Sequence, residues 1–210
     1  MVSRLIEREM MRSALPVRRG VLLLVVGPSG AGKDTLIGGA RKRFAEDDDV
    51  LFVRRAITRP EDPAGEDHLP MDRHEFEAAR RSGQFAVSWE AHGLSYGIPA
   101  TVDDHLADGG VAVANGSRAA LPLFAAHYLN LMIVNVTARP EVLAGRLSAR
   151  GRESADAILA RLARSVAAPV AAPSCDMARI DNSGNVEDAV SVLVGLIEKA
   201  LARSSISDVL

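Results

Sequence analysis

Three glycines and one lysine stand at the spacing of a phosphate-binding loop. Gly27, Gly32 and Lys33 occupy the fixed positions, and Gly30 adds freedom between them. Glycine lets a backbone wrap around a phosphate so that its N–H groups point at the anion, while the lysine brings positive charge to the outer phosphates. We therefore expect ATP or GTP to bind at Gly27, Pro28, Ser29, Gly30, Ala31, Gly32, Lys33, Asp34 and Thr35.

The residue after the lysine departs from the usual pattern of such loops. A Ser or Thr normally holds a magnesium ion there, but this chain has Asp34, and Thr35 follows one place later. A carboxylate also binds Mg²⁺, so Asp34 is the predicted metal ligand, although an acid that only complements a helix N-terminus would look the same. Asn115 stands where related folds often carry a metal-binding Asp, which suggests that the acid has moved to the loop.

Apolar runs on either side of the loop predict the framework that positions it. Val21–Val26 is expected to be a strand buried on both faces, and Leu36–Phe44 a helix that continues from the loop. Further apolar stretches at residues 50–57, 111–114 and 131–136 predict more strands. Buried strands that alternate with helices indicate a parallel sheet covered on both sides. We therefore predict an α/β fold of three layers with a parallel central sheet.

Smaller elements are expected between these strands. Asp72 fits a helix N-cap with Glu75 as its capping-box partner. Residues 85–97 predict short strands and turns, and residues 103–107 predict a helix.

Composition limits the class of protein. The 210 residues are 48% hydrophobic and 25% charged, which favours one globular domain. Lys and Arg number 25 and Asp and Glu 27, so a net charge of −2 offers no positive field to nucleic acid or an anionic membrane. Apolar runs are too short to cross a bilayer, charges interrupt residues 1–19, and Cys175 is the single cysteine. We expect a cytoplasmic protein; the sequence leaves its oligomeric state open.

Several motifs together resemble the guanylate kinase branch of the nucleoside monophosphate kinases. They are the loop at 27–33, Ile57-Thr-Arg-Pro60, residues 85–97 and the run Arg146-Leu-Ser-Ala-Arg-Gly-Arg-Glu153. The resemblance implies a P-loop NTPase fold, with residues 1–19 as an extension and 20–203 as the kinase domain. It also implies a small acceptor-binding lobe in the middle of the chain and a lid at about 145–160 that closes over ATP.

The positions that would bind guanine differ from that branch. Its guanine-binding Glu falls on Val87, and its Thr falls on Ile98. A Val side chain cannot accept the N–H groups of guanine. A second phosphate-binding arginine of the branch falls on Asp62. We therefore expect an acceptor that offers a phosphate but no guanine.

A second family matches more of these residues. Asp34, Ile57-Thr-Arg59, Ser88-Trp89, Asn115-Gly-Ser-Arg118 and Arg150-Gly-Arg-Glu153 resemble the ribose 1,5-bisphosphate phosphokinases of phosphonate breakdown. In this family Asp34 and Asn115 belong to the pattern. The resemblance implies transfer of the ATP γ-phosphoryl group to the 1-phosphate of ribose 1,5-bisphosphate, with Mg²⁺. A guanylate or other nucleoside monophosphate kinase is the alternative, and the intact loop disfavours a catalytically silent binding module.

Arginines are the expected catalytic partners, because transfer onto a phosphate needs positive charge rather than a strong base. Arg59 and Arg118 are the candidate acceptor-phosphate contacts, although a solvated loop arginine or a simple Asn-Gly turn would look similar. The predicted catalytic set is Lys33, Asp34, Arg59, Arg118, Arg150 and Arg161. Trp89, His92 and Tyr96 fit either a sugar pocket or core packing.

The C-terminal third is expected to be mainly helical from Pro140 onward, with a last helix that ends near Leu201. Arg146, Arg150 and Arg152 fit ATP contacts of a lid, but arginines on a solvated helix face would show the same spacing. Asn182 lies in a turn at 181–184 where related kinases approach adenine, and a plain turn residue is the competing interpretation.

Overall fold

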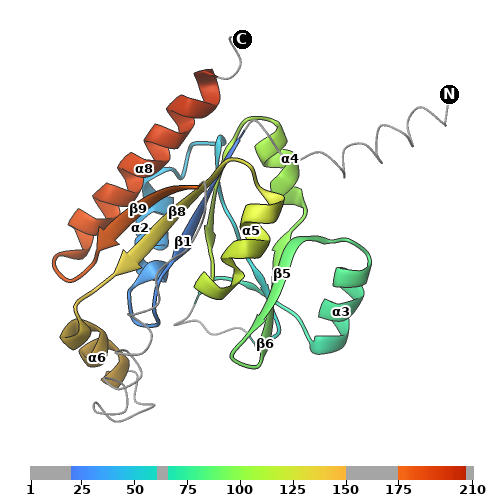
Figure 1. Cartoon of the computed structure of the whole chain (residues 1–210), viewed down its shortest axis with the longest axis horizontal. Helices are drawn as coiled ribbons and strands as arrows, with labels where there is room; N and C mark the ends of the chain where they lie inside the picture. The colour runs from blue at the N-terminus through green and yellow to red at the C-terminus, as the bar shows by residue number, and fades with distance from the viewer. Residues whose placement is uncertain (1–19, 61–65, 150–174, 207–210) are drawn as a thin grey trace.

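The computed structural model describes residues 20–60, 66–149 and 175–206. Its centre is a five-stranded parallel sheet in the order β2-β7-β1-β8-β9 (Figure 1). These strands are β1 (Val21–Val26), β2 (Val50–Phe52), β7 (Val111–Asn115), β8 (Leu131–Thr137) and β9 (Asp176–Asp181). The predicted α/β fold with a parallel central sheet is therefore confirmed.

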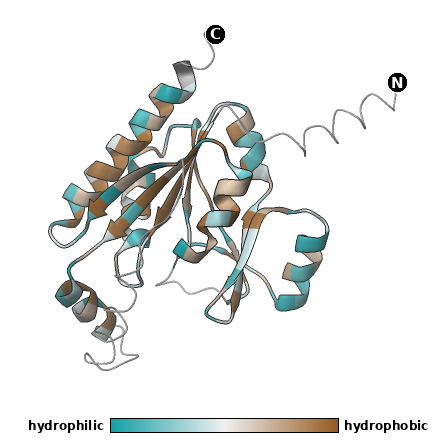
Figure 2. Cartoon of the chain, viewed as in Figure 1, coloured by the Kyte–Doolittle hydropathy of each residue, from teal (hydrophilic) through white to brown (hydrophobic). Residues whose placement is uncertain are grey.

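Helices cover both faces of this sheet, as expected for three layers. Alternate residues of β1 point to opposite sides. Val21, Leu23 and Val25 pack with α2 (Lys33–Arg43) and α8 (Val186–Ile206), whereas Leu22 and Leu24 pack with α4 (Thr101–Ala107) and α5 (Leu121–His127). The central strands are correspondingly apolar in Figure 2, between helices of mixed character. Every residue of β1 is buried, which fixes the position of the loop that follows it.

A second, smaller sheet is formed by the middle segment of the chain, which the resemblance assigns to an acceptor-binding lobe. Its order is β4-β3-β6-β5, and the strands are β3 (Ala56–Ile57), β4 (Leu69–Pro70), β5 (Phe85–Ala91) and β6 (Leu94–Pro99). The helix α3 (Arg73–Arg81) flanks it (Figure 1), and its predicted capping box between Asp72 and Glu75 is present. We use "acceptor lobe" below for this second sheet with α3.

Three expectations about the elements need correction. The apolar stretch at 50–57 is divided between β2 and β3, which belong to different sheets. The edge strand β9 was not expected, because its sequence is polar and most of its residues are exposed or half-buried. The last helix continues to Ile206 rather than ending near Leu201.

The remaining described elements are a short 3₁₀ turn (Arg118–Ala120) and α6 (Pro140–Ser148). The expected extension at 1–19 and the lid from residue 150 onward lie outside the described residues. No helix in the described part of the chain combines the length and the apolar character needed to span a membrane.

Candidate active site

The glycine loop joins β1 to α2 in a shape that only glycine permits at its end. Gly32 has φ of +87°, the left-handed region that L side chains rarely adopt. A Cβ at this position would also overlap the side-chain amide of Asn182. The sequence therefore needs glycine both for the backbone angle and for this close approach.

The Gly32→Ala variant is expected to lose about 2 kcal/mol of unfolding free energy, because a left-handed alanine costs about 1–2 kcal/mol and the overlap adds to it. Gly38→Ala, in the helix α2 that follows Gly32, is the control, since a methyl group there meets nothing within 4 Å beyond its own turn of the helix. That control should gain about 0.5–1 kcal/mol. Urea unfolding of both variants measures the difference, and equal effects would contradict the assigned geometry.

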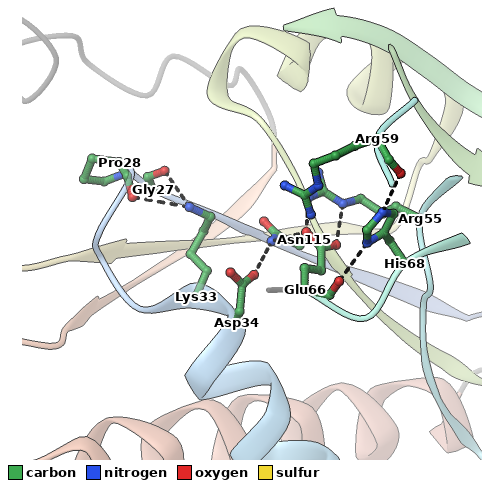
Figure 3. A network of polar contacts seen from close by, with 9 residues as sticks. All are labelled: Gly27, Pro28, Lys33, Asp34, Arg55, Arg59, Glu66, His68 and Asn115. Atoms are coloured by element: carbon green, nitrogen blue, oxygen red, sulfur yellow. Dashed lines mark hydrogen bonds and ion pairs between the residues drawn. The ribbon is translucent and has the colours of Figure 1, made fainter. Parts of the chain in front are cut away.

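Lys33 folds back over the loop that it closes (Figure 3). Its Nζ donates to the carbonyl oxygens of Gly27 at 3.0 Å and Pro28 at 3.3 Å. Burial lowers the pKa of Lys33; the charge of Asp34 opposes this shift, and Arg55 and Arg118 add to it. The ammonium has thus lost hydration, and a phosphate held in the loop would supply the missing negative charge.

Asp34 and Asn115 meet across the loop, as their residue types suggested. Asn115 Nδ2 donates to Asp34 Oδ1 at 2.7 Å and to Glu66 Oε2 at 3.3 Å. Asp34 is exposed in the first turn of α2, and Asn115 is buried at the carboxyl end of β7. The acid on the loop therefore lies beside the strand end that often carries a metal-binding Asp.

Glu66 is paired on its other side with Arg55 in a two-point ion pair. Arg55 Nε donates to Glu66 Oε1 at 2.7 Å, and Arg55 Nη2 contacts Glu66 Oε2. The two side chains are only 8% and 15% exposed. The Arg55 guanidinium also lies 5.0 Å from the ring centre of Tyr96 and 5.7 Å from that of Trp89, which stack on each other.

Arg59 follows β3 and faces a cavity of about 470 Å³ in the acceptor lobe, which Arg73 and Ser95 also line. His68 Nε2 bonds to the Arg59 carbonyl oxygen at 3.1 Å, which anchors the backbone there. Arg59 Nε is buried and has no hydrogen-bond partner among the described residues. A contact of Arg59 with an acceptor phosphate stays a prediction.

Arg146 and Asn182 lie on the opposite side of the loop and hold its backbone. Arg146 Nη2 donates to the Asn182 carbonyl oxygen at 2.9 Å, and its Nη1 reaches the Ala31 carbonyl oxygen at 3.4 Å. Asn182 is fully buried, and its Nδ2 donates to Ala31 at 2.8 Å. Both residues thus support the phosphate loop, whereas a contact of Asn182 with adenine stays a prediction.

The other predicted residues fall into three groups. Arg118 is half-buried three residues after β7, and its charge contributes to lowering the pKa of Lys33. Ser29 and Thr35 are exposed on the loop, whereas Pro28 and Ala31 are buried. The remaining two arginines of the catalytic set, Arg150 and Arg161, lie outside the described residues.

Comparison with known proteins identifies the relatives of this chain. It is 50% identical over 186 residues to a protein named ribose 1,5-bisphosphate phosphokinase PhnN from Rhizobium etli, covering 88% of this chain and 93% of that protein. A protein of the same name from a Chelativorans species is 44% identical over 209 residues and matches 99% of both chains. The chain belongs to the ribose 1,5-bisphosphate phosphokinase family. No family model matches the chain.

The fold of this ribose 1,5-bisphosphate phosphokinase family member is that of guanylate kinase. The crystal structure of guanylate kinase from Anaplasma phagocytophilum superimposes with a TM-score of 0.64, at 16% identity and 88% coverage of each chain. The P-loop NTPase fold expected from the motifs is therefore confirmed.

The family assignment agrees with the state of the two guanine-reading positions. Val87 and Ile98 are cross-strand partners in the β5–β6 hairpin, and both are buried in the apolar core beneath β1. Trp89 belongs to the same core, and His92 is exposed in the hairpin turn with φ of +53°. In this member of the ribose 1,5-bisphosphate phosphokinase family, both positions thus belong to the apolar packing of the β5–β6 hairpin.

Sequence reasoning missed Arg55, Glu66 and His68, which join the loop to the acceptor lobe. His68 is buried, and its Nδ1 bonds to the Glu66 carbonyl oxygen at 2.8 Å. One signal was present: two consecutive arginines interrupt the apolar stretch at 50–57. A charged residue in a buried segment requires a partner, and Glu66 is that partner.

Proposed function

We propose that this protein transfers the γ-phosphoryl group of ATP to the 1-phosphate of ribose 1,5-bisphosphate and so forms 5-phosphoribosyl 1-diphosphate and ADP. The observation that carries the proposal is the combination of an intact phosphate loop with an acceptor lobe whose base-reading positions, Val87 and Ile98, are apolar and buried. Relatives that match nearly the whole chain bear the name of this activity.

The reaction needs charge neutralisation more than proton transfer. The attacking phosphate oxygen is already anionic, so the site must bring two anions together and stabilise the charge that develops between them. Lys33 would bind the outer phosphates of ATP, and Arg59 and Arg118 would bind the acceptor. Arg146 would keep the loop in shape while Arg150 and Arg161 approach the ATP phosphates.

Asp34 offers a carboxylate oxygen, which is the kind of ligand that Mg²⁺ prefers. Asn115 holds one oxygen of Asp34. The second oxygen, which accepts no hydrogen bond from a residue that the structure describes, would serve as a ligand or as a partner for a metal-bound water. The described residues contain no group of three His, Cys, Asp or Glu that could hold a metal. Phosphate oxygens and water would therefore complete the coordination. When bound, Mg²⁺ would neutralise negative charge on the β- and γ-phosphates.

The proposed activity also implies a compartment, a pathway and a set of partners. We place it in the cytoplasm and in phosphonate breakdown, without a nucleic acid or membrane partner. A net charge of −2 provides no attraction for either polyanion, and a single cysteine suits a reducing compartment.

A comparison of acceptors tests the function directly. With ATP and Mg²⁺, kcat/KM for ribose 1,5-bisphosphate is expected to exceed that for GMP, AMP or dTMP by at least about 10²-fold, because each unmade hydrogen bond to a base costs about 1–3 kcal/mol. Coupled ADP release gives the rates, and ³¹P NMR identifies the new diphosphate. Rapid turnover of GMP and none of the sugar would instead establish a guanylate kinase.

A further inference from the structure

A continuous run of polar contacts connects the phosphate loop with the acceptor lobe (Figure 3). It passes from Asp34 to Asn115, then to Glu66, and ends at Arg55. These four residues come from α2, the end of β7, the segment before β4 and the segment between β2 and β3. We call them the polar relay. The relay joins elements that are far apart in the sequence.

Asn115 is the joint of the relay because one amide nitrogen serves two acids. Its Nδ2 carries two hydrogens, which suit Asp34 Oδ1 at 2.7 Å and Glu66 Oε2 at 3.3 Å. An aspartate at position 115 would repel both carboxylates instead. A neutral donor at this strand end therefore allows two acids to lie close together beside the phosphate loop.

Glu66 is the fixed end of this arrangement. Arg55 grips both of its carboxylate oxygens, and Tyr96 and Trp89 pack against the Arg55 guanidinium. His68 bonds to the Glu66 backbone oxygen, so the main chain is held as well. Asp34, the other end of the relay, is exposed, and its partner there is Asn115. Glu66 is thus held at several points, whereas Asp34 is held within the relay by Asn115.

We propose that Glu66 is a positioning residue, which aims Asp34 at the Mg²⁺ of the nucleotide by holding the Asn115 amide between them. This inference rests on the proposed function. In this role Glu66 acts through Asn115, which it keeps in the rotamer that presents its N–H groups to both acids. Asp34 then meets the metal in one fixed orientation.

The test compares nucleotide affinity with and without metal in the Glu66→Gln variant. Isothermal titration with a non-hydrolysable ATP analogue is done once with Mg²⁺ and once with EDTA. In the unmodified protein Mg²⁺ should tighten binding. In Glu66→Gln this enhancement should fall at least tenfold, while the metal-free affinity stays within about threefold, because Lys33 and the loop are untouched.

Asp67→Asn is the matched control on the adjacent residue. Asp67 is 50% exposed and pairs with Arg41 and Arg54, outside the polar relay. Its substitution should leave the metal enhancement unchanged. In an Asp34→Asn background, Glu66→Gln should have no further effect on the enhancement, because its influence passes through Asp34.

These measurements distinguish the positioning role of Glu66 from the proposed kinase activity. Failure of the unmodified protein to bind the analogue at all would remove the proposed function. An unchanged enhancement in Glu66→Gln, or an equal loss with and without Mg²⁺, would overturn the positioning role alone. If Glu66→Gln does not fold, Asn115→Ala breaks the relay while it keeps the Arg55 ion pair. That variant must show the same selective loss of the metal enhancement.

Discussion

The Lys33→Met variant is expected to lose about 10³-fold in kcat and to unfold within about 2 °C of the unmodified protein. The loss follows from the position of the ammonium, which lies 3.0 Å from the Gly27 carbonyl oxygen in the loop. Removal of a single neutral donor from a transition state costs about 10²–10³-fold, and a full positive charge near a transferred phosphoryl group should cost no less.

The stability half of this prediction follows from the sign of the pKa shift. Burial lowers the pKa of Lys33, so folding weakens its hold on the proton. At neutral pH the side chain is charged in the unfolded chain, and keeping that charge in the folded state opposes folding. Loss of the ammonium therefore removes the free-energy cost of burying a charge, which offsets the loss of its two hydrogen bonds. Methionine also preserves the packing of the aliphatic stem.

Lys42→Met provides the control, because Lys42 is an exposed lysine on the same helix. It should leave both kcat and the melting temperature unchanged. Steady-state kinetics and thermal unfolding by circular dichroism measure the two quantities. A Lys33→Met enzyme with full turnover would contradict the role of Lys33, whereas a large drop in melting temperature would show that the ammonium stabilises the fold.

The central sheet and the phosphate loop were predictable because their signals are local. A strand buried on both faces, such as β1, must be apolar throughout, and glycines at fixed spacing must follow it. The capping box at Asp72 is equally local, since both partners lie within four residues. Each of these features is encoded in a short window of sequence.

Elements without a buried face were not predictable in this way. The strand β9 forms the edge of the sheet, and its register with β8 is set by backbone pairing rather than by apolar side chains. The break between β2 and β3 depends on Arg54 and Arg55, whose partners lie eleven or more residues away. Neither feature has a periodic signature.

The candidate site shows the same division. The sequence predicted that the acid usually found at the strand end stands in the loop as Asp34, with Asn115 in its former place, because both positions belong to a known pattern. The two side chains do meet in the structure. The Arg55–Glu66 ion pair was not readable, because no spacing rule connects those positions. Its existence depends on the tertiary arrangement of the acceptor lobe against β7.

The buried ion pair leads to the second large effect. The Arg55→Met variant is expected to lose about 3 kcal/mol of unfolding free energy, because Glu66 would remain buried without its counter-ion. This value is at the low end of the usual range, since Asn115 still donates to Glu66 and the charge of Lys33 lies near it. For a chain of this size the melting temperature should fall by roughly 6–12 °C.

Two further variants separate the ion pair from general damage. Arg54→Met removes the neighbouring arginine, which is 45% exposed, pairs with Asp67 and donates to the His68 carbonyl oxygen at 3.1 Å, so it should cost about 1 kcal/mol. The double variant Arg55→Met/Glu66→Met should recover more than half of the loss, because no uncompensated charge is left behind. Urea unfolding of the unmodified protein, Arg55→Met, Glu66→Met and the double variant gives the coupling energy between Arg55 and Glu66. If the double variant were less stable than Arg55→Met alone, Glu66 would have another partner that is strong enough to hold its charge, and the relay would not depend on Arg55.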